Sequence, residues 1–369
     1  MKRWFVLLAA LVLCCFPSLG HAADEPAPAA PAKSAVPLLA YYYQWFDAGS
    51  WRRAKTDVPA LGAYSSDDAK VIRQQIRWAE SAGIDGFITS WKDTPKLDRR
   101  LEKLMAIARS EHFRLAMLYE GLDFGRRPQA VSRVAADFRT FRDRYAHDPV
   151  FLRLGGRPLT VFSGTCKFSH QDVARVTSGV RPDLLVLSTE KNAAGYRRLA
   201  DVTDGDAYYW SSVNPDTYPD APAKLRAMAR AVHADGHYWI APFAPGFDAR
   251  RVGGTRSVPR RDGGTLRAEY ANAARSSPDV LGLISWNEFS ENSQIEPSKA
   301  YGTRYLDVLR ELHGAVQAPQ SPVAGDSGGG PAQHKAQRLV LVATGMVVPA
   351  VAVACVAVWR RRRSGSVSR

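Results

Sequence analysis

The sequence predicts an α/β fold, and more specifically a (β/α)8 barrel. Short apolar runs typical of buried strands alternate with amphipathic helical patterns, which favours a parallel sheet. Eight such strand–helix units follow one another within about 280 residues, a number and length that suit a closed barrel. A doubly wound sheet is the alternative, but no glycine-rich phosphate-binding turn follows the first strand.

The strands and helices can be assigned in order from these patterns. In the first helix, Ser65 is the expected N-cap, and Ile72, Ile76 and Ala79 recur on one face. The expected strands are 38–46, 86–91, 114–120, 158–163, 184–190, 206–211, 237–244 and 280–286. The expected helices are 65–83, 97–110, 130–145, 171–178, 196–202, 221–234, 265–276 and 301–312.

The first 23 residues have the pattern of a secretory signal. Lys2 and Arg3 precede an apolar run, and small residues at positions 20–23 supply a cleavage site. The apolar run is short for a membrane span, so an uncleaved anchor is the weaker interpretation. We therefore expect residues 1–23 to be a signal peptide and the mature chain to be exported.

The mature chain divides into a linker, one domain, a second linker and a membrane anchor. The segments 24–35 and 316–338 are rich in Pro, Ala, Gly and Ser, as linkers are, and they flank a domain over 36–315. Residues 339–359 carry no charge and are numerous enough for a helix to cross a bilayer. The tail, 360–369, begins with four arginines, which favours a cytoplasmic location. We expect a single-pass membrane protein with its domain outside the cytoplasm.

Charge and cysteine content exclude several classes of protein. The net charge is +14, but the signal and the tail hold seven basic and no acidic residues, which leaves 43 basic and 36 acidic residues elsewhere. The arginines are scattered pairs without interleaved aromatics, so a nucleic-acid partner is not expected. Cys166 is the one cysteine of the expected domain, which excludes a disulfide within it and gives no metal-binding set.

Acidic and aromatic residues gather where the expected strands end. In a barrel of this kind the active site lies at the carboxyl ends of the strands. Aromatic rings cover the apolar faces of sugars and carboxylates bind hydroxyls, so this composition favours a carbohydrate site. The candidate substrate-binding residues are Tyr42, Tyr43, Trp45, Trp91, Glu120, Tyr209, Trp210, Phe247, Trp286 and Asn287.

Glu288 and Glu291 are the candidate catalytic pair. Cleavage of a glycosidic bond needs a proton donor at the leaving oxygen and a second carboxylate that acts as base or nucleophile. Two carboxylates in one pocket raise the pKa of one of them, which then serves as an acid near neutral pH. The spacing alone also fits two glutamates on a solvated loop.

The segment over residues 286–298, WNEFSENSQIEPS, resembles the eighth-strand motif of glycoside hydrolase family 99. That family contains endo-α-mannosidases, endo-α-1,2-mannanases and related bacterial domains. The segments YYQWF at 42–46, GAYSSDD at 62–68 and AGIDGF at 82–87 resemble its first strand, first helix and second strand. The resemblance covers about 38–312, and the eighth-strand motif is its most specific part.

The resemblance implies a (β/α)8 barrel that hydrolyses an internal α-mannosidic bond with retention of configuration. In the mechanism ascribed to the family, a carboxylate deprotonates the sugar's own 2-hydroxyl, which displaces the leaving group and forms an anhydro sugar. Carried over, Glu288 is that base, Glu291 protonates the leaving oxygen and later activates water, and Glu120 holds hydroxyls. Neither a metal nor an organic cofactor is implied.

The sequence departs from the family pattern at several positions. Phe289 stands where the family usually has Trp, Asn292 where it has Gly, and Phe247 where it favours Tyr. The family's His-Trp pair after the first strand is represented by Trp51 alone. These departures leave the glutamate pair intact but leave the sugar open. A non-catalytic carbohydrate-binding barrel and a wall-glycan transglycosylase are therefore the alternatives to a membrane-anchored endo-acting α-glycosidase.

Overall fold

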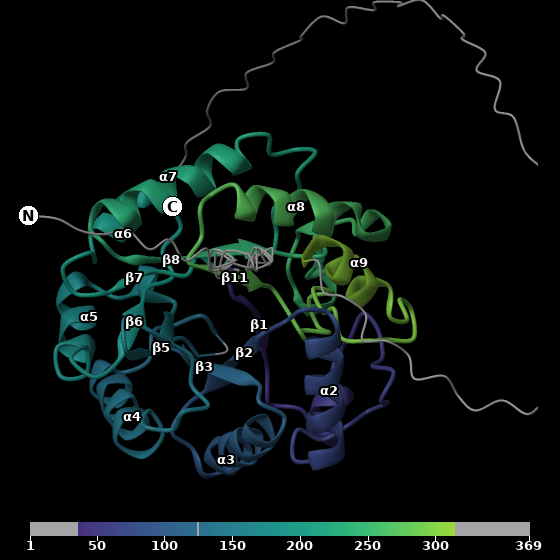
Figure 1. Ribbon diagram of the computed structural model, residues 1–369, viewed down its shortest axis with the longest axis horizontal. Coiled ribbons are helices and arrows are strands. Elements are labelled where there is room, and N and C mark those ends of the chain that lie inside the picture. Colours follow the sequence, from purple (N-terminus) through teal and green to yellow (C-terminus); the bar gives the residue numbers. More distant parts are fainter. Residues whose placement is uncertain (1–35, 124, 314–369) are drawn as a thin grey trace, which may run out of the picture. The chain divides into compact units, whose positions relative to one another are not determined.

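The computed structural model describes residues 36–123 and 125–313. Within them, eight parallel strands are each followed by a helix, as the sequence predicted, and Figure 1 shows the helices around the strands. The strands are β1 (Leu38–Tyr42), β2 (Gly86–Trp91), β3 (Arg114–Glu120), β5 (Arg157–Ser163), β6 (Leu185–Leu187), β7 (Gly205–Asp206), β8 (Tyr238–Phe243) and β11 (Val280–Leu283). The helices are α2 (Ala69–Ser81), α3 (Pro95–Ser110), α4 (Val131–Arg144), α5 (His170–Thr177), α6 (Ala193–Arg197), α7 (Ala221–Ala234), α8 (Gly264–Ala274) and α9 (Arg304–His313).

Short elements decorate the connections between these units. They are α1 (Ala48–Trp51), β4 (Arg153–Leu154), β9 (Phe247–Asp248), β10 (Ser257–Val258) and the 3-10 turns η1 (Thr165–Lys167), η2 (Arg250–Val252) and η3 (Arg261–Gly263). Strand β4 pairs antiparallel with β5, and β9 pairs antiparallel with β10. Except for β4, these elements lie in the loops that follow β1, β5 and β8.

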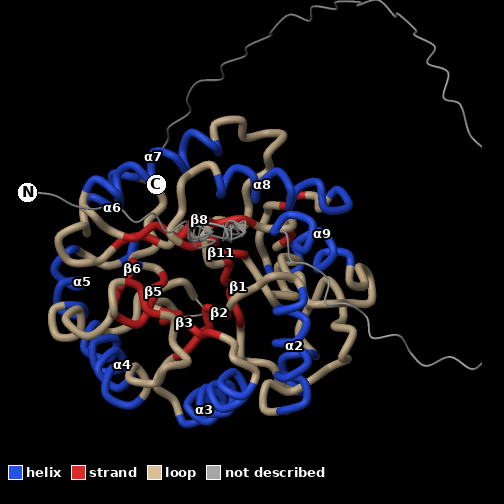
Figure 2. The backbone as a smooth tube through the Cα atoms, viewed as in Figure 1, coloured by secondary structure: helices blue, strands red, loops and turns tan. Residues whose placement is uncertain are grey.

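Each parallel strand pairs with the next one along the chain, apart from the short antiparallel elements. Strand β1 also pairs with β11, so that Leu39 lies between Gly86 and Gly282. Between β6 and β7 the pairing is reduced to one parallel bridge, which joins Ser188 to Asp206. The sheet is therefore strongly curved, and Figure 2 shows its strands enclosed by helices.

The strands are buried on both faces because helices cover one face and the curved sheet encloses the other. Along β1, Leu38, Ala40 and Tyr42 belong to the core beneath the helices, whereas Leu39 and Tyr41 belong to the inner core. Successive side chains of a strand point to opposite faces. This two-sided burial explains why the strands appear in the sequence as near-continuous apolar runs.

The first helix of the eight begins later than the sequence predicted. Asp68, rather than Ser65, is the N-cap of α2, and its Oδ1 accepts a hydrogen bond from the Lys70 N–H at 2.8 Å. The Ser65 hydroxyl instead accepts a hydrogen bond from the Asp67 N–H at 3.1 Å and closes a turn before the helix. Both residue types cap helices and turns well, so composition alone could not distinguish them.

Strands β6 and β7 are shorter than the predicted segments 184–190 and 206–211. After β6, the main-chain N–H groups of Thr189 and Glu190 donate to side-chain oxygens and not to main-chain carbonyls of a neighbouring strand. Thr189 N–H donates to the Thr165 hydroxyl at 3.0 Å, and Glu190 N–H donates to Asp206 Oδ2 at 2.8 Å. Side-chain acceptors thus end the ladder here earlier than the apolar pattern suggests.

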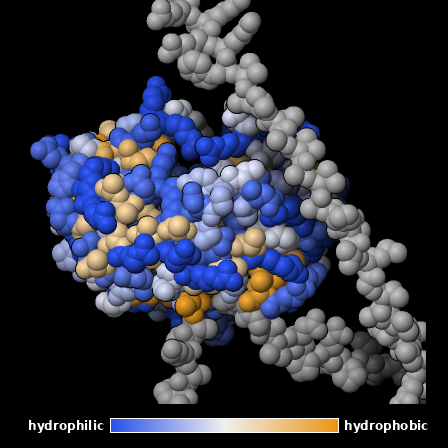
Figure 3. Space-filling view, turned by 90° about the horizontal axis from the view of Figure 1, so that it is seen from above, coloured by the Kyte–Doolittle hydropathy of each residue, from blue (hydrophilic) through white to orange (hydrophobic). Residues whose placement is uncertain are grey.

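The face of the molecule in Figure 3 is largely hydrophilic, with small separate apolar groups. Among the helices of residues 36–123 and 125–313, none is long and apolar enough to cross a membrane. The predicted signal, linkers, membrane span and tail, at 1–35 and 316–369, lie outside the described residues.

Candidate active site

Three glutamates from two strand ends lie close together at the carboxyl edge of the sheet. Glu120 is the last residue of β3, and Glu288 and Glu291 lie in the loop that follows β11. The charge of Glu291 contributes to raising the pKa of both Glu120 and Glu288, which makes these carboxyls electrostatic neighbours. These carboxyls thus form an acidic group at the edge where barrel enzymes carry their chemistry.

Two tyrosine hydroxyls lie among these carboxyls. Tyr43 follows β1 and Tyr209 follows β7, and their hydroxyl oxygens are 2.6 Å apart. Burial raises the pKa of both phenols, and the charges of Glu120 and Glu288 raise both further. Both hydroxyls therefore stay protonated at neutral pH, and together they can donate a hydrogen bond to a sugar oxygen.

Glu288 is held by its own loop and is almost withdrawn from water. Its main-chain N–H donates to the Ser285 hydroxyl at 2.9 Å, and its Oε1 accepts from the Ser290 N–H at 3.0 Å. Burial and, to a smaller extent, the nearby charge of Glu291 raise the pKa of Glu288 to about 7, against the opposing effects of the Ser290 N–H and the charge of Lys55. A carboxyl with a pKa in this range can exchange a proton near neutral pH.

Glu291 and Glu120 have raised pKa values for the same main reason. Burial raises the pKa of Glu291, and the charge of Arg126 partly offsets the effect. Burial also raises the pKa of Glu120, against the opposing charges of Lys92 and Arg126. Perturbed carboxyls gathered in one pocket are typical of an active site.

The three cations that balance these glutamates were not among the residues predicted from the sequence. Lys55 lies in the loop after α1, Lys92 directly follows β2, and Arg126 lies in the loop after β3. Lys55 donates to the Ser50 carbonyl at 3.0 Å and Lys92 to the Leu122 carbonyl at 3.1 Å. A search for charged residues directly after strands would have found Lys92, whereas nothing in the sequence distinguishes Lys55 or Arg126 from other loop cations.

Trp45, Tyr209 and Trp210 are the predicted aromatic residues that are partly exposed. Trp45 stacks on Tyr43, with ring centroids 4.3 Å apart and planes 21° apart. Trp210 stacks on Tyr208, with centroids 5.2 Å apart. Because one ring of each pair keeps exposed surface, Trp45 and Trp210 are available to cover sugar rings.

Four predicted substrate-binding residues have structural roles instead. Tyr42, Trp91 and Trp286 are at most 2% exposed and lie in the core between the sheet and the helices, where a sugar has no access. The amide of Asn287 is used internally, since it accepts from the Tyr43 N–H at 2.8 Å and donates to the Tyr43 carbonyl at 2.9 Å. For Tyr42, the alternation of side chains along the strand explains why the predicted substrate-binding role is wrong. Tyr41 and Tyr43 face inward, whereas Tyr42 faces the helices.

The positions that depart from the family pattern also receive structural explanations. Phe247 is buried in β9 against Ala249 and Val258, so its edge contributes little to the pocket. Asn292 has φ of 49°, a left-handed conformation that favours Gly but that Asn tolerates. Phe289 is buried and meets Trp51 edge to face, at 5.7 Å between centroids. The loop that carries Glu288 and Glu291 thus accommodates these side chains in its own packing.

A buried hydrogen-bonded chain that the sequence did not reveal lies beneath the glutamate pair. Glu296 accepts from Gln75 Nε2 at 2.9 Å and from the Tyr64 hydroxyl at 2.8 Å. Tyr64 in turn accepts from Asn287 Nδ2 at 3.3 Å, and Gln75 accepts from the Tyr42 hydroxyl at 2.8 Å. This chain joins β1, α2 and the loop after β11, and so it fixes the loop that presents Glu288.

Within residues 36–123 and 125–313, no group of three or more His, Cys, Asp or Glu side chains is arranged to hold a metal ion.

Comparisons with solved structures support the same fold. The endo-α-mannosidase of Bacteroides thetaiotaomicron is 20% identical in its complex with BIS-TRIS-propane, with a TM-score of 0.65 over 75% of this chain and 98% of that one. A second structure of that enzyme is 19% identical, with a TM-score of 0.65 over 76% and 98%. A glycoside hydrolase-like protein is 17% identical, with a TM-score of 0.58 over 78% and 97%. At these identities the likeness shows a shared fold.

The fold is a curved α/β sheet enclosed by helices, and the family match defines the chain as a glycosidase. The chain matches glycosyl hydrolase family 99 over residues 52–314 and belongs to that family, which confirms the resemblance seen in the sequence. A search of curated proteins found no match.

We expect Glu296→Ala to lower the free energy of unfolding by about 2–5 kcal/mol, because it opens a cavity and leaves two buried donors without an acceptor. Chemical denaturation would measure this. The matched control is Glu80→Ala, at an exposed position of α2, which should change stability by less than about 0.5 kcal/mol. Equal effects of the two substitutions would contradict the structural role of Glu296.

The same residue should make stability depend on pH. Burial raises the pKa of Glu296 from 4.5 to about 8, so the native protein holds a proton that the unfolded chain releases. The contribution of Glu296 to stability is therefore present below about pH 4.5 and is lost as pH rises toward 8. Thermal unfolding should be measured at several pH values. As pH rises toward 8, the Tm of Glu296→Gln should fall less than the Tm of the wild type.

Proposed function

We propose that the protein is a retaining, endo-acting glycosidase that cleaves an α-mannoside or a similar α-glycan. The convergence of Glu120, Glu288 and Glu291 around the paired hydroxyls of Tyr43 and Tyr209 carries this proposal. The endo-α-mannosidase of Bacteroides thetaiotaomicron, which shares the fold, supports the choice of α-mannoside.

In this proposal the two carboxyls of the loop after β11 have different roles, Glu288 as the base and Glu291 as the acid. Glu288 takes the proton of the sugar's 2-hydroxyl, whose oxygen attacks the anomeric carbon as the glycosidic bond breaks. Glu291 gives its proton to the leaving oxygen. It then takes a proton from water, which opens the anhydro sugar, while Glu288 returns its proton to the 2-oxygen. The raised pKa values of both carboxyls suit groups that must both accept and donate protons near neutral pH.

Trp45 and Trp210 support endo action. They stack on Tyr43 and Tyr208, which follow strands on different parts of the sheet edge, and each keeps exposed surface. A glycan chain that runs from one tryptophan to the other would present an internal linkage to the glutamates. In this proposal Glu120, with its buried carboxyl, accepts hydrogen bonds from sugar hydroxyls.

We also infer that the curved sheet is a closed (β/α)8 barrel and that the chain is anchored in a membrane. The pairing of β11 with β1, together with the bridge from Ser188 to Asp206, supports closure. The signal pattern over 1–23 and the uncharged segment 339–359, followed by arginines, support export and a single anchor.

Glu291→Gln should lower kcat on α-mannan by about 10²- to 10⁴-fold, because the leaving oxygen loses its proton donor. Release of reducing ends would measure this, with the exposed Glu80→Gln as a control that keeps wild-type activity. Activity retained by Glu291→Gln would refute its role. Saturable binding of the glycan by the wild type without product would instead favour a non-catalytic barrel.

The acidic limb of the pH profile should report the ionisation of Glu288, near pH 7. Lys55 stabilises the charged form of this carboxyl, so Lys55→Met should raise its pKa and move the limb to higher pH. The pH dependence of kcat/KM would measure the shift. Lys70→Met, on the outer surface of α2, removes the same charge and should leave the limb in place.

Protease treatment of intact cells should degrade the domain and leave a tag placed after Arg369 protected, because the arginines after residue 359 favour a cytoplasmic tail. Immunoblots against the domain and the tag would measure both. An accessible tag with a protected domain would overturn the proposed orientation.

A further inference from the structure

One lysine lies over an aromatic pair at this edge, and the charges of two further cations reach the lysine or the pair. Lys224, in the first turns of α7, places its Nζ 4.4 Å from the Trp210 ring centroid and 4.9 Å from that of Tyr208, and it donates to the Tyr208 hydroxyl at 3.0 Å. Lys191, which follows β6, is near enough for its charge to lower the pKa of Lys224, after the larger effect of burial. Arg256 acts electrostatically on Tyr208 from the loop after β8.

These three cations have no carboxylate partner. Salt bridges within 4.0 Å in the described part of the chain include neither Lys191, Lys224 nor Arg256, and Arg256 instead contacts the Ser212 hydroxyl at 3.4 Å. The nearby carboxylates are already used by other arginines: Asp216 pairs with Arg261 at 2.5 Å, Asp248 with Arg250 at 2.6 Å, and Glu190 with Arg198 at 3.2 Å.

Two further carboxyls at this edge do not neutralise the group. Asp206 is buried and accepts hydrogen bonds from Ser188 and Glu190, and burial raises its pKa well above its ordinary value. Asp220, the N-cap of α7, is exposed. Even with both of these acids charged, three cations leave a net positive charge around the aromatic pair.

Half-burying a lysine without a counter-ion costs free energy, and rings and a phenol offset only part of that cost. A bound anion would offset the remainder. The adjacent ring of Trp210, which keeps exposed surface, is a surface for a sugar. The arrangement therefore combines a platform for a sugar ring with cations for a negative substituent.

The position of the three cations relative to the glutamates determines which sugar of the substrate carries the negative substituent. Trp210 follows Tyr209 directly in the chain, and the Tyr209 hydroxyl lies among Glu120, Glu288 and Glu291. A negative substituent inside that acidic pocket would be repelled. The charge therefore belongs on a sugar next to the one that is cleaved.

We propose that Lys191, Lys224 and Arg256, together with Tyr208 and Trp210, form a subsite for a negatively charged sugar of the substrate. The substrate class is thus an α-glycan with an anionic substituent, such as a phosphate ester, on a residue beside the cleaved linkage. This assignment rests on the proposed glycosidase function and specifies its substrate.

The test compares charged and neutral forms of the same polymers. Full-length protein carrying Glu291→Gln would be titrated with α-mannan, with phosphorylated α-mannan, and with a neutral and phosphorylated α-glucan pair. At low ionic strength we expect at least one phosphorylated polymer to bind about fivefold or more tightly than its neutral parent. About 1 M salt should remove most of the difference.

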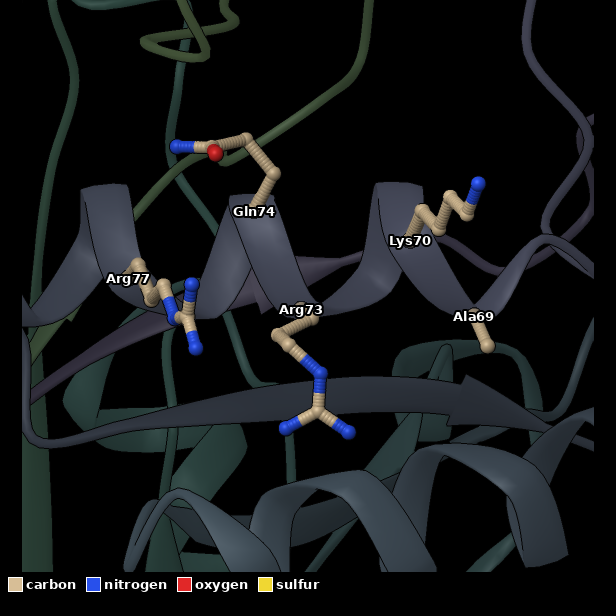
Figure 4. A pocket seen from close by; sticks show the side chains of 5 residues that line it. All are labelled: Ala69, Lys70, Arg73, Gln74 and Arg77. Carbon is tan, nitrogen blue, oxygen red and sulfur yellow. The ribbon is translucent and has the colours of Figure 1, made fainter.

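Lys224→Met in the same background should abolish the preference, since it keeps the apolar stem against the rings and removes the charge. Lys224→Arg should retain it. The matched control is Lys70→Met, which removes a lysine from the first turn of α2 in the hollow shown in Figure 4, and it should leave the preference unchanged.

Equal affinity for charged and neutral polymers would overturn the proposal, and so would an equal loss of preference in Lys70→Met and Lys224→Met. Hydrolysis of neutral α-mannan by the wild type tests the glycosidase function separately. A protein that cleaves neutral mannan without preferring the charged form would keep the proposed function and lose the anionic subsite. A protein that prefers the charged polymers but cleaves none of them would keep the anionic subsite and lose the proposed glycosidase function.

Discussion

Two hydrogen bonds between the Asn287 side chain and the main chain of Tyr43 hold the active edge together. They join residues 244 positions apart, at 2.8 and 2.9 Å, across the seam where the first and last strands meet. Glu288 follows Asn287 directly, so the same contact fixes this glutamate relative to the phenol of Tyr43. The buried chain through Tyr64 and Glu296 supports Asn287 from below. The geometry of the proposed site thus depends on the pairing of β1 with β11 as much as on the glutamates.

Burial is the common cause of the unusual acidity in this region. It is the largest contribution to the raised pKa values of Glu120, Glu288, Glu291 and Glu296. Withdrawing carboxyls from water costs folding free energy unless hydrogen bonds or cations compensate. Here Lys55, Lys92 and Arg126 compensate only partly, so the pocket keeps protons available near neutral pH at the expense of stability.

The sequence was sufficient for the order of elements and for the acidic loop, because apolar periodicity and a local motif carry that information. It was less informative about which face a residue occupies. Tyr42 and Trp91 end β1 and β2 as predicted, but strand alternation turns them toward the helices. Trp286 lies beyond the end of β11, which is shorter than predicted, and is buried in the same core. Lys55 and Arg126 come from irregular loops, whose course depends on tertiary contacts that no periodicity encodes. Glu296 belongs to the family-like segment, yet its partner Gln75 lies 221 residues away.

The unequal lengths of the strand pairings divide the edge of the sheet into two parts. Glu120 ends β3, and Tyr43 and Glu288 follow β1 and β11. The ladders of these three strands are continuous, whereas β6 and β7 meet through one bridge. Lys191 and Trp210 lie in the loops after these two short strands. Evolution can therefore exchange residues in those loops and change which glycan is recognised without altering the acidity of the glutamates. In such an arrangement, relatives can differ in the glycan that they recognise while they keep the same proton-transfer chemistry.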